Sequence, residues 1–225
     1  LGEAVPRFGL LVHAYCLMPN HYHLVVETPR ANLSRAMGWL QVTYTVRFNR
    51  RHRRCGHLFQ GRFKAHLVSA EGYGMRLVNY VHLNPVRPRG KDKPIPAERA
   101  EELDAYPWSS HPAYAGLARK PVWLCVDWLR FWGRTAAVAR SSYRVAMAEA
   151  FGRTLPSPWD ELRGGLVLGT DQLWERTRRL VDAKETDEEL HWTERRREEH
   201  ARGEVKKMAA KESDADIQMW LRVKL

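Results

Sequence analysis

The sequence predicts an α+β protein, in which a domain built on an antiparallel sheet is followed by a mostly helical C-terminal region. Apolar runs of strand length flank Pro19-Asn20, a turn dipeptide, which predicts two adjacent strands joined by a tight turn. Residues 71–84 carry apolar side chains at helical spacing, and Asn84-Pro85 ends the pattern because a residue before proline avoids helical geometry. Short helical patterns then recur from residue 123 onward.

Five elements are expected in the N-terminal domain, and Asn32 is a suitable N-cap for the first of its two helices. In chain order they are strands at 8–18 and 21–27, a helix at 32–51, a strand at 58–69 and a helix at 71–84. Prolines and glycines recur through residues 85–121, which predicts a long irregular connection. Tyr106, Trp108 and Tyr114 indicate that this connection is packed.

These patterns divide the chain into four segments. They are an N-terminal domain at 1–90, a packed connection rich in proline and aromatic residues at 91–122, a helical region at 123–182, and a charged helical tail at 183–225. A truncated DNA-binding appendage is one interpretation of the tail, and a solvated helix face is another.

His21-Tyr22-His23 begins the second predicted strand and is the most informative feature of the chain. Side chains two apart on a strand share a face, so both imidazoles can reach one metal ion while Tyr22 points to the other face. Tyr80 and Asn84 are four apart on the predicted helix and so lie one above the other. A phenol oxygen and an amide carbonyl would then be presented together, as nucleophile and third metal ligand.

Ordinary structural roles remain open for each part when it is taken alone. A His-x-His pattern on a strand arises often by chance, and a buried tyrosine with a satisfied hydroxyl is common. Charge provides a separate argument. The net charge is +11, and residues 1–91 hold 14 of the basic residues and 3 of the acidic ones, so the whole excess lies with the motif.

The basic residues of the N-terminal domain form clusters that suit a channel for a polyanion. Tyr44 and Phe59 lie among them, as a surface for stacking single-stranded bases requires, while Phe48 and Phe63 are expected in the core. The candidate DNA-binding residues are Arg47, Arg50, Arg51, Arg53, Arg54, Arg62, Lys64 and Arg87.

Three blocks carry a family resemblance: residues 15–24 (YCLMPNHYHL), 56–63 (GHLFQGRF) and 79–87 (NYVHLNPVR). In this order they resemble the Y1 (HUH) transposases of the IS200-like family, most closely the REP-associated tyrosine transposases. The resemblance continues through residues 106–110, with Tyr114 and Gly116, and fades near residues 166–169 and Val181. Tyr22 stands where the family more usually has an aliphatic residue.

The resemblance implies a ferredoxin-like palm, whose first strand and helix would precede Leu1 and whose sheet would then lack a central strand. It implies that His21, His23 and Asn84 hold a divalent metal, and that Tyr80 attacks single-stranded DNA to form a 5′-phosphotyrosine. Magnesium or manganese suits such phosphate chemistry. The expected partner is single-stranded DNA, with a hairpin next to the cleavage point, and a monomer is favoured over a dimer.

Two other functions remain open. One is a non-catalytic nucleic-acid-binding module on the same fold. The other is a metal-dependent hydrolase that uses water, for which Glu27 would be the acidic ligand nearest the histidines. No run approaches the ~20 apolar residues of a membrane helix, and the three cysteines are widely spaced. A reducing, cytoplasmic setting without membrane association is therefore expected.

Overall fold

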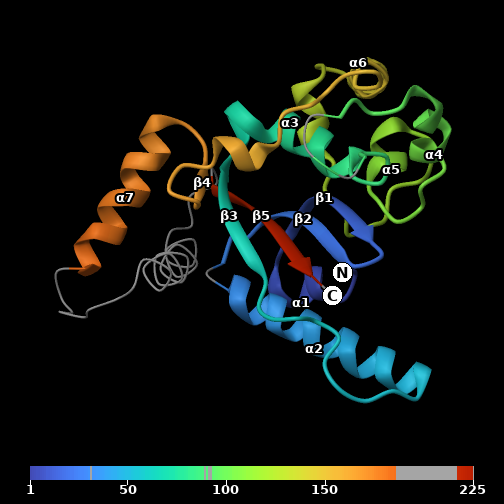
Figure 1. Ribbon diagram of the computed structural model, residues 1–225. Helices are drawn as coiled ribbons and strands as arrows, with labels where there is room; N and C mark the ends of the chain where they lie inside the picture. Colours follow the sequence, from blue (N-terminus) through green and yellow to red (C-terminus); the bar gives the residue numbers. More distant parts are fainter. Residues whose placement is uncertain (31, 89, 91–92, 186–216, 225) are drawn as a thin grey trace.

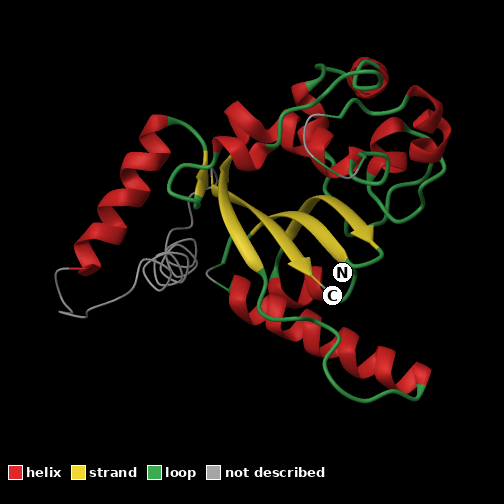
Figure 2. Ribbon diagram, in the orientation of Figure 1, coloured by secondary structure: helices red, strands yellow, loops and turns green. Residues whose placement is uncertain are grey.

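In the computed structural model, helices lie on both faces of a five-stranded sheet (Figures 1 and 2). The structure describes every residue except 31, 89, 91–92, 186–216 and 225. Across the sheet, the strands are β1 (Leu11–Met18), β2 (His21–Glu27), β5 (Ile217–Lys224), β3 (Lys64–Ser69) and β4 (Val167–Leu168). Neighbours are antiparallel except β3 and β4, which are parallel. The predicted α+β class is confirmed.

The β1–β2 hairpin turns at Pro19-Asn20, as predicted, and places Met18 opposite His21. Its first strand starts at Leu11 instead of residue 8, because a short helix, α1 (Ala4–Phe8), ends there at Gly9. Gly9 has a φ of 67°, a left-handed conformation that is natural for a glycine after a helix. The chain therefore enters the sheet three residues later than its apolar pattern indicates.

The two faces of the sheet support different helices. On one face lie α1 and α2 (Leu33–His52), and the side chains of Tyr22 and Leu24 enter the core on this side. Asn32 occupies the N-cap position of α2, as predicted, but its side chain does not cap the helix. Its Nδ2 donates instead to the carbonyl of Phe8 at 2.7 Å and so ties α2 to α1.

On the other face lies α3 (Ala70–Leu83), which follows β3 directly and buries Leu77, Val78 and Val81 against the sheet. The predicted helix at 71–84 is confirmed to within one residue, with Asn84 as its C-cap. The strand before it begins at Lys64, whereas the sequence predicts residue 58. Gly56, with a φ of 96°, and the bends through residues 58–62 interrupt the extended chain.

The connection after α3 packs on β1 through Tyr106 and Tyr114, as predicted, whereas Trp108 is 61% exposed. It contains a 3₁₀ turn, η1 (Ala97–Arg99), and two short helices, α4 (Ala100–Asp104) and α5 (His111–Ala115). The Tyr114 hydroxyl donates to the carbonyl of His13 on β1 at 2.8 Å. Trp128 and Trp132, in and next to η2 (Asp127–Phe131), are buried packing residues, and α6 (Ala136–Ala148) covers this layer.

A chain of buried hydrogen bonds joins α3 to this layer. His111 donates from Nε2 to Asp104, so its Nδ1 accepts from the Tyr143 hydroxyl at 2.7 Å. That hydroxyl accepts in turn from His82 Nδ1 at 2.8 Å, and His82 Nε2 lies 2.6 Å from the Ser110 hydroxyl oxygen. Burial lowers the pKa of both imidazoles, which favours their neutral forms.

Two strands lie where the sequence predicts helical structure. Beyond η3 (Pro158–Glu161), β4 adds to the sheet beside β3 and is followed by α7 (Asp171–Glu185). Residues 217–224 of the predicted helical tail form β5, which pairs with both β2 and β3. The sheet therefore has a central strand, contrary to the expectation that it lacks one. The rest of the tail from residue 186 lies outside the described residues.

No helix in the described part of the chain is both long and apolar enough to cross a lipid bilayer.

Candidate active site

His21 and His23 meet on the α3 face of β2, as their spacing predicts. Their Nε2 atoms are 3.1 Å apart, and the rings lie edge to face. His23 is buried, while His21 at the hairpin end is half-buried. Tyr22 points to the opposite face, where burial raises the pKa of its hydroxyl, so it takes no part in this site.

Asn20 in the hairpin turn orients the His21 ring. Its carboxamide oxygen lies 2.7 Å from His21 Nδ1. An amide oxygen can only accept, so Nδ1 carries the proton and Nε2 keeps a lone pair. Two nitrogens that each lie about 2.1 Å from one ion, at angles near 90–109°, are about 3.0–3.4 Å apart. The 3.1 Å separation of the imidazole nitrogens therefore fits a shared metal ion.

Tyr80 projects from α3 to the histidines. Its ring meets the ring of His23 edge to face, with centroids 5.9 Å apart. Two residues beyond α3 also contact it. Trp159 in η3 donates from Nε1 to the Tyr80 hydroxyl at 3.1 Å. The guanidinium carbon of Arg87 lies 4.6 Å from the centroid of the Tyr80 ring, within the range of a cation–π contact.

Asn84 lies one helical turn after Tyr80, as predicted. Its Nδ2 donates to the carbonyl of Tyr80 at 2.7 Å, which closes the last turn of α3. The amide nitrogen is committed to the helix, so the carboxamide oxygen is the atom with which Asn84 would bind a metal. Hydrogen bonding to the backbone thus fixes the plane of the amide relative to Tyr80.

The predicted DNA-binding residues fall into two places. Most lie exposed at the far end of α2 and in the segment that leads to β3, on the side of the sheet opposite α3 (Figure 1). Arg47 among them forms a two-contact ion pair with Glu3. Arg87 alone of the eight lies against Tyr80. Burial lowers the pKa of its guanidinium, whose Nη2 donates to the carbonyl of Leu155 at 3.0 Å.

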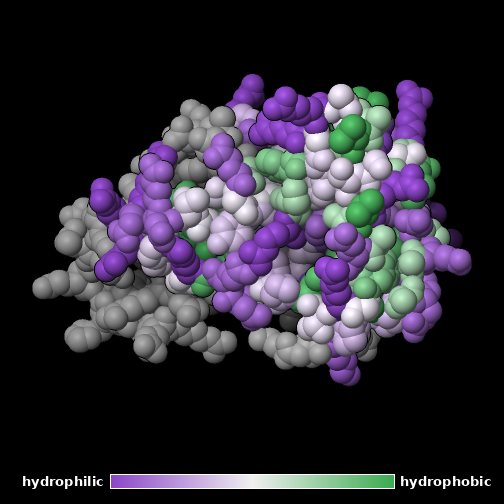
Figure 3. Space-filling view, turned by 90° about the horizontal axis from the view of Figure 1, so that it is seen from above, coloured by the Kyte–Doolittle hydropathy of each residue, from purple (hydrophilic) through white to green (hydrophobic). Residues whose placement is uncertain are grey.

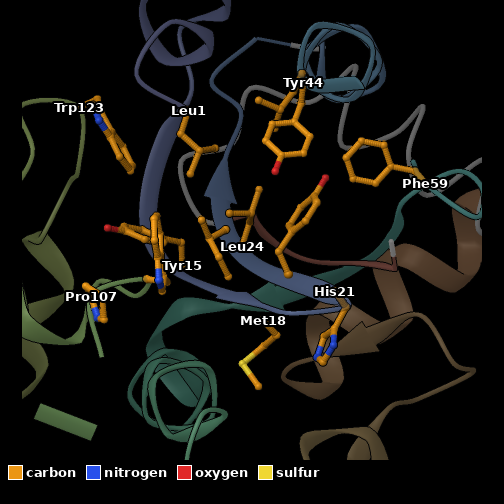
Figure 4. Close-up of a pocket in the computed structure, with 13 residues that line it drawn as sticks. Leu1, Tyr15, Met18, His21, Leu24, Tyr44, Phe59, Pro107 and Trp123 are labelled. Carbon is orange, nitrogen blue, oxygen red and sulfur yellow. The ribbon is translucent and has the colours of Figure 1, made fainter. Parts of the chain in front are cut away.

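A hollow of about 420 Å³ lies on the α2 side of the β1–β2 hairpin. Tyr44 from α2 and Phe59 from the segment before β3 stand at one end of it, and His21 at the other (Figure 4). Tyr44 is half exposed, and its ring centroid lies 6.1 Å from that of Phe59. The hollow therefore extends along the hairpin from Tyr44 and Phe59 to His21, while His23 is not among the residues that line it.

Glu27 does not belong to the histidine site. It lies at the far end of β2, opposite Leu11, and its carboxylate is 3.1 Å from His13 Nε2. Within the described part of the chain, no three His, Cys, Asp or Glu side chains gather as a metal site would require. The geometry therefore does not support the hydrolase interpretation.

Sequence reasoning missed two residues of this site, Asn20 as a partner of His21 and Trp159 as a partner of Tyr80. Asn20 lies in the predicted turn, and an amide next to a candidate ligand is the sequence signal for this partner. Trp159 has no such signal, because its segment reaches Tyr80 only through the tertiary fold.

The fold and the site together define a tyrosine hydroxyl held on a helix beside two imidazoles on a strand. Residues 1–84 match the model of a family described as transposase IS200 like. The match includes His21, His23, Tyr80 and Asn84, so the part of the chain that carries these residues is similar to that family. No curated protein and no solved structure matches the chain.

Proposed function

We propose that the chain is a metal-dependent single-stranded DNA endonuclease and strand transferase, a transposase of the HUH tyrosine type. The observation that carries the proposal is the meeting of Tyr80 with the His21–His23 pair, from a helix and a strand far apart in sequence. The match of residues 1–84 to IS200-like transposases supports it. The sheet would serve as the ferredoxin-like palm of this class, and the kinship would be closest to the REP-associated members.

The metal would be held by His21 Nε2, His23 Nε2 and the carboxamide oxygen of Asn84. For His23 to bind, its ring proton must move from Nε2 to Nδ1, since Nε2 now faces the lone pair of His21. Mixed nitrogen and oxygen ligands with phosphate as a further ligand suit manganese or magnesium. When bound, the ion would supply positive charge to a non-bridging phosphate oxygen.

In the cleavage step, the Tyr80 oxygen forms a bond to phosphorus as the bond from phosphorus to the 3′-oxygen breaks. The phenolic proton passes to solvent, and the departing 3′-oxygen takes up a proton to become a free hydroxyl. The product is a 5′-phosphotyrosine, and rejoining to another 3′-hydroxyl reverses the step. Arg87 over the ring keeps Tyr80 in place and adds positive charge near the reacting phosphate.

DNA would reach the site from the basic end of α2. The exposed arginines there would bind backbone phosphates, and Tyr44 and Phe59 would stack on unpaired bases. We propose a hairpin next to the cleavage point as the preferred substrate and a monomer as the working form, in the cytoplasm. Titrations with hairpin and unstructured oligonucleotides measure the substrate preference. Light scattering measures the mass of the protein in solution and so tests the monomer.

The direct test is capture of the covalent intermediate. Labelled single-stranded hairpin DNA is incubated with protein and manganese or magnesium and then separated under denaturing conditions. We expect label on the protein for the wild type and for Tyr73→Phe, a control tyrosine on the same helix, and none for Tyr80→Phe. Loss of the adduct on adding a chelator would establish the need for metal.

The competing function is a non-catalytic nucleic-acid-binding module, for which the excess of basic residues is the specific observation. DNA binding by the wild type without any adduct, in manganese and in magnesium, would favour that function over the enzyme. An adduct that persists in Tyr80→Phe would assign the nucleophile to another residue.

A further inference from the structure

The hydroxyl of Tyr80 receives a hydrogen bond from outside its own helix. Trp159 lies in η3, 79 residues further along the chain, and its Nε1 is 3.1 Å from the Tyr80 oxygen. An indole nitrogen can only donate, so the tyrosine oxygen is the acceptor. The phenolic hydrogen must therefore point away from Trp159, and one lone pair of the oxygen is occupied before any substrate binds.

Contacts on several sides fix the position of Trp159. The backbone nitrogen of Trp159 donates to the Ser157 hydroxyl at 3.4 Å. Glu161 forms a two-contact ion pair with Arg76 on α3, which binds η3 to the helix that carries Tyr80. The His66 ring on β3 meets the indole edge to face, with centroids 4.8 Å apart. The indole is thus held by α3 and by the sheet.

The neighbouring hollow has the charge that a DNA backbone requires. A cavity of about 240 Å³ opens beside Tyr80 between α3, the end of α6 and the segment before η3. Arg76, Arg87 and Arg153 line it, with Glu149 on the same wall. Seen from above, hydrophilic side chains cover much of this face of the molecule (Figure 3). Tyr80 therefore lines a hollow in which arginines outnumber acidic residues.

We propose that Trp159 is a further catalytic residue, which aims the Tyr80 oxygen and stabilises the negative charge that develops on it. This inference rests on the proposed function. In cleavage the oxygen gains charge as its proton leaves and before its bond to phosphorus is complete. In rejoining the same oxygen departs with the electron pair of that bond. A fixed N–H donor stabilises the oxygen most at these points, since hydrogen bonds to charged oxygen are the stronger ones.

The test compares Trp159→Phe with the wild type. Phenylalanine keeps an aromatic ring in the space and removes the N–H group. Trp39→Phe is the matched control, because Trp39 is also half-buried and packs on Phe8 at the other face of the sheet. Single-turnover adduct formation on saturating hairpin DNA, DNA affinity and melting temperature are measured for all three proteins.

We expect Trp159→Phe to form the adduct roughly 10- to 100-fold more slowly, somewhat less than the loss of a principal oxyanion donor. DNA affinity and melting temperature should stay at wild-type values, and Trp39→Phe should react at the wild-type rate. An unchanged rate in Trp159→Phe would overturn the inference while leaving the proposed function in place. A slower rate that is accompanied by weaker DNA binding and a lower melting temperature would also overturn it, because the substitution would then have damaged the protein as a whole.

A second measurement reports the contact without relying on activity. In nitrogen-edited NMR spectra, the signal of the Trp159 indole N–H group is identified as the one that is missing from the spectrum of Trp159→Phe. We expect this signal to move upfield in Tyr80→Phe, where the acceptor is gone, and to stay in place in Tyr73→Phe. A signal that does not move would overturn the inference. If the wild type forms no adduct at all, the proposed function and the catalytic role both fall, even where the NMR shift shows the contact.

Discussion

Asn20 shows how a single turn residue can decide what a neighbouring imidazole is able to bind. Its carboxamide oxygen holds the proton of His21 on Nδ1 and so leaves the lone pair of Nε2 directed at His23. Partners of this kind commonly change metal affinity by about 10- to 100-fold. The turn that closes the hairpin would therefore also orient His21 for the proposed metal site.

Asn20→Ala is expected to weaken manganese binding by roughly 10- to 100-fold, because the His21 ring loses the acceptor that fixes its tautomer. Asn20→Asp, which keeps an acceptor oxygen, should retain most of the affinity. Isothermal titration with manganese measures the change. Asn49→Ala removes a comparable side-chain hydrogen bond, to the carbonyl of Gly56, and serves as the control. Equal affinities for Asn20→Ala and the wild type would show that His21 is oriented by other contacts.

The residues that sequence could predict at this site are those related by local geometry. Alternation along a strand places His21 and His23 on one face, and helical spacing places Asn84 over Tyr80. Trp159 could not be predicted in this way, since only the folding of η3 against α3 and β3 brings it to Tyr80. The assignment of chemical roles to these residues stays a prediction.

At the scale of elements, two glycines on α3 have opposite surroundings. A Cβ atom at Gly74 would lie 2.7 Å from Cε2 of Phe131 and 3.3 Å from Cε3 of Trp128, whereas one at Gly72 would meet no atom within 4 Å. Gly74→Ala should therefore destabilise the protein by about 1–3 kcal/mol through overpacking against η2. Gly72→Ala should stabilise it by up to about 1 kcal/mol through helix propensity.

Urea unfolding of the two variants under identical conditions measures this difference. Both substitutions add one methyl group to the same helix. Any effect of that group on the free energy of unfolding that does not depend on its position therefore cancels in the comparison. Stabilisation by Gly74→Ala would mean that Phe131 moves aside freely, and that α3 and η2 are not closely packed.

The buried hydrogen-bond chain that joins α3 to α4, α5 and α6 makes folding sensitive to acid. Burial lowers the pKa of His111, so the unfolded chain binds a proton more readily than the folded one. Stability should be complete above the unfolded pKa of about 6.5 and fall as the pH drops below it, by up to about 1.4 kcal/mol per pH unit for one histidine. His82, whose pKa burial also lowers, acts in the same direction.

Urea unfolding at a series of pH values between 7.5 and 5 measures this loss. His111→Gln should be less stable than the wild type at pH 7.5 but show a shallower decline toward pH 5. His57→Gln, which alters an exposed histidine, should leave the decline unchanged. A decline of the same steepness in His111→Gln would assign the acid sensitivity to other groups.

Elements defined by their own sequence were predicted well, and those defined by distant partners were not. The hairpin turn, β2, α2 and α3 follow from local patterns that the structure confirms. The two residues of β4 are recognisable as a strand only through their pairing with Leu67 and Val68. Likewise β5 lies between two strands from the other end of the chain, a position that no local pattern encodes.

At the scale of the whole molecule, the charge is divided between two parts of the chain. Residues 1–91 hold 14 basic and 3 acidic residues, and the remaining 134 residues hold 23 of each. The first part forms the hairpin, the long basic helix α2 and the helix that carries Tyr80. Counterion release from DNA should therefore depend mainly on exposed arginines of this part, and little on arginines of the second part that lie away from the hollow beside Tyr80.

This division leads to a prediction about salt. Changing Arg50, Arg51, Arg54 and Arg62 to glutamine removes four exposed positive charges near α2. The plot of log binding constant against log salt concentration should become shallower by up to about 3, at about 0.7 for each lost phosphate contact on single strands. A matched variant with the same net charge carries glutamine in place of four arginines that are also exposed but lie in the second part of the chain. These are Arg119, Arg134, Arg140 and Arg144. Its slope should stay within about 1 of the wild type. Equal changes in both variants would mean that the DNA responds to the total charge of the protein instead of to a surface beside α2.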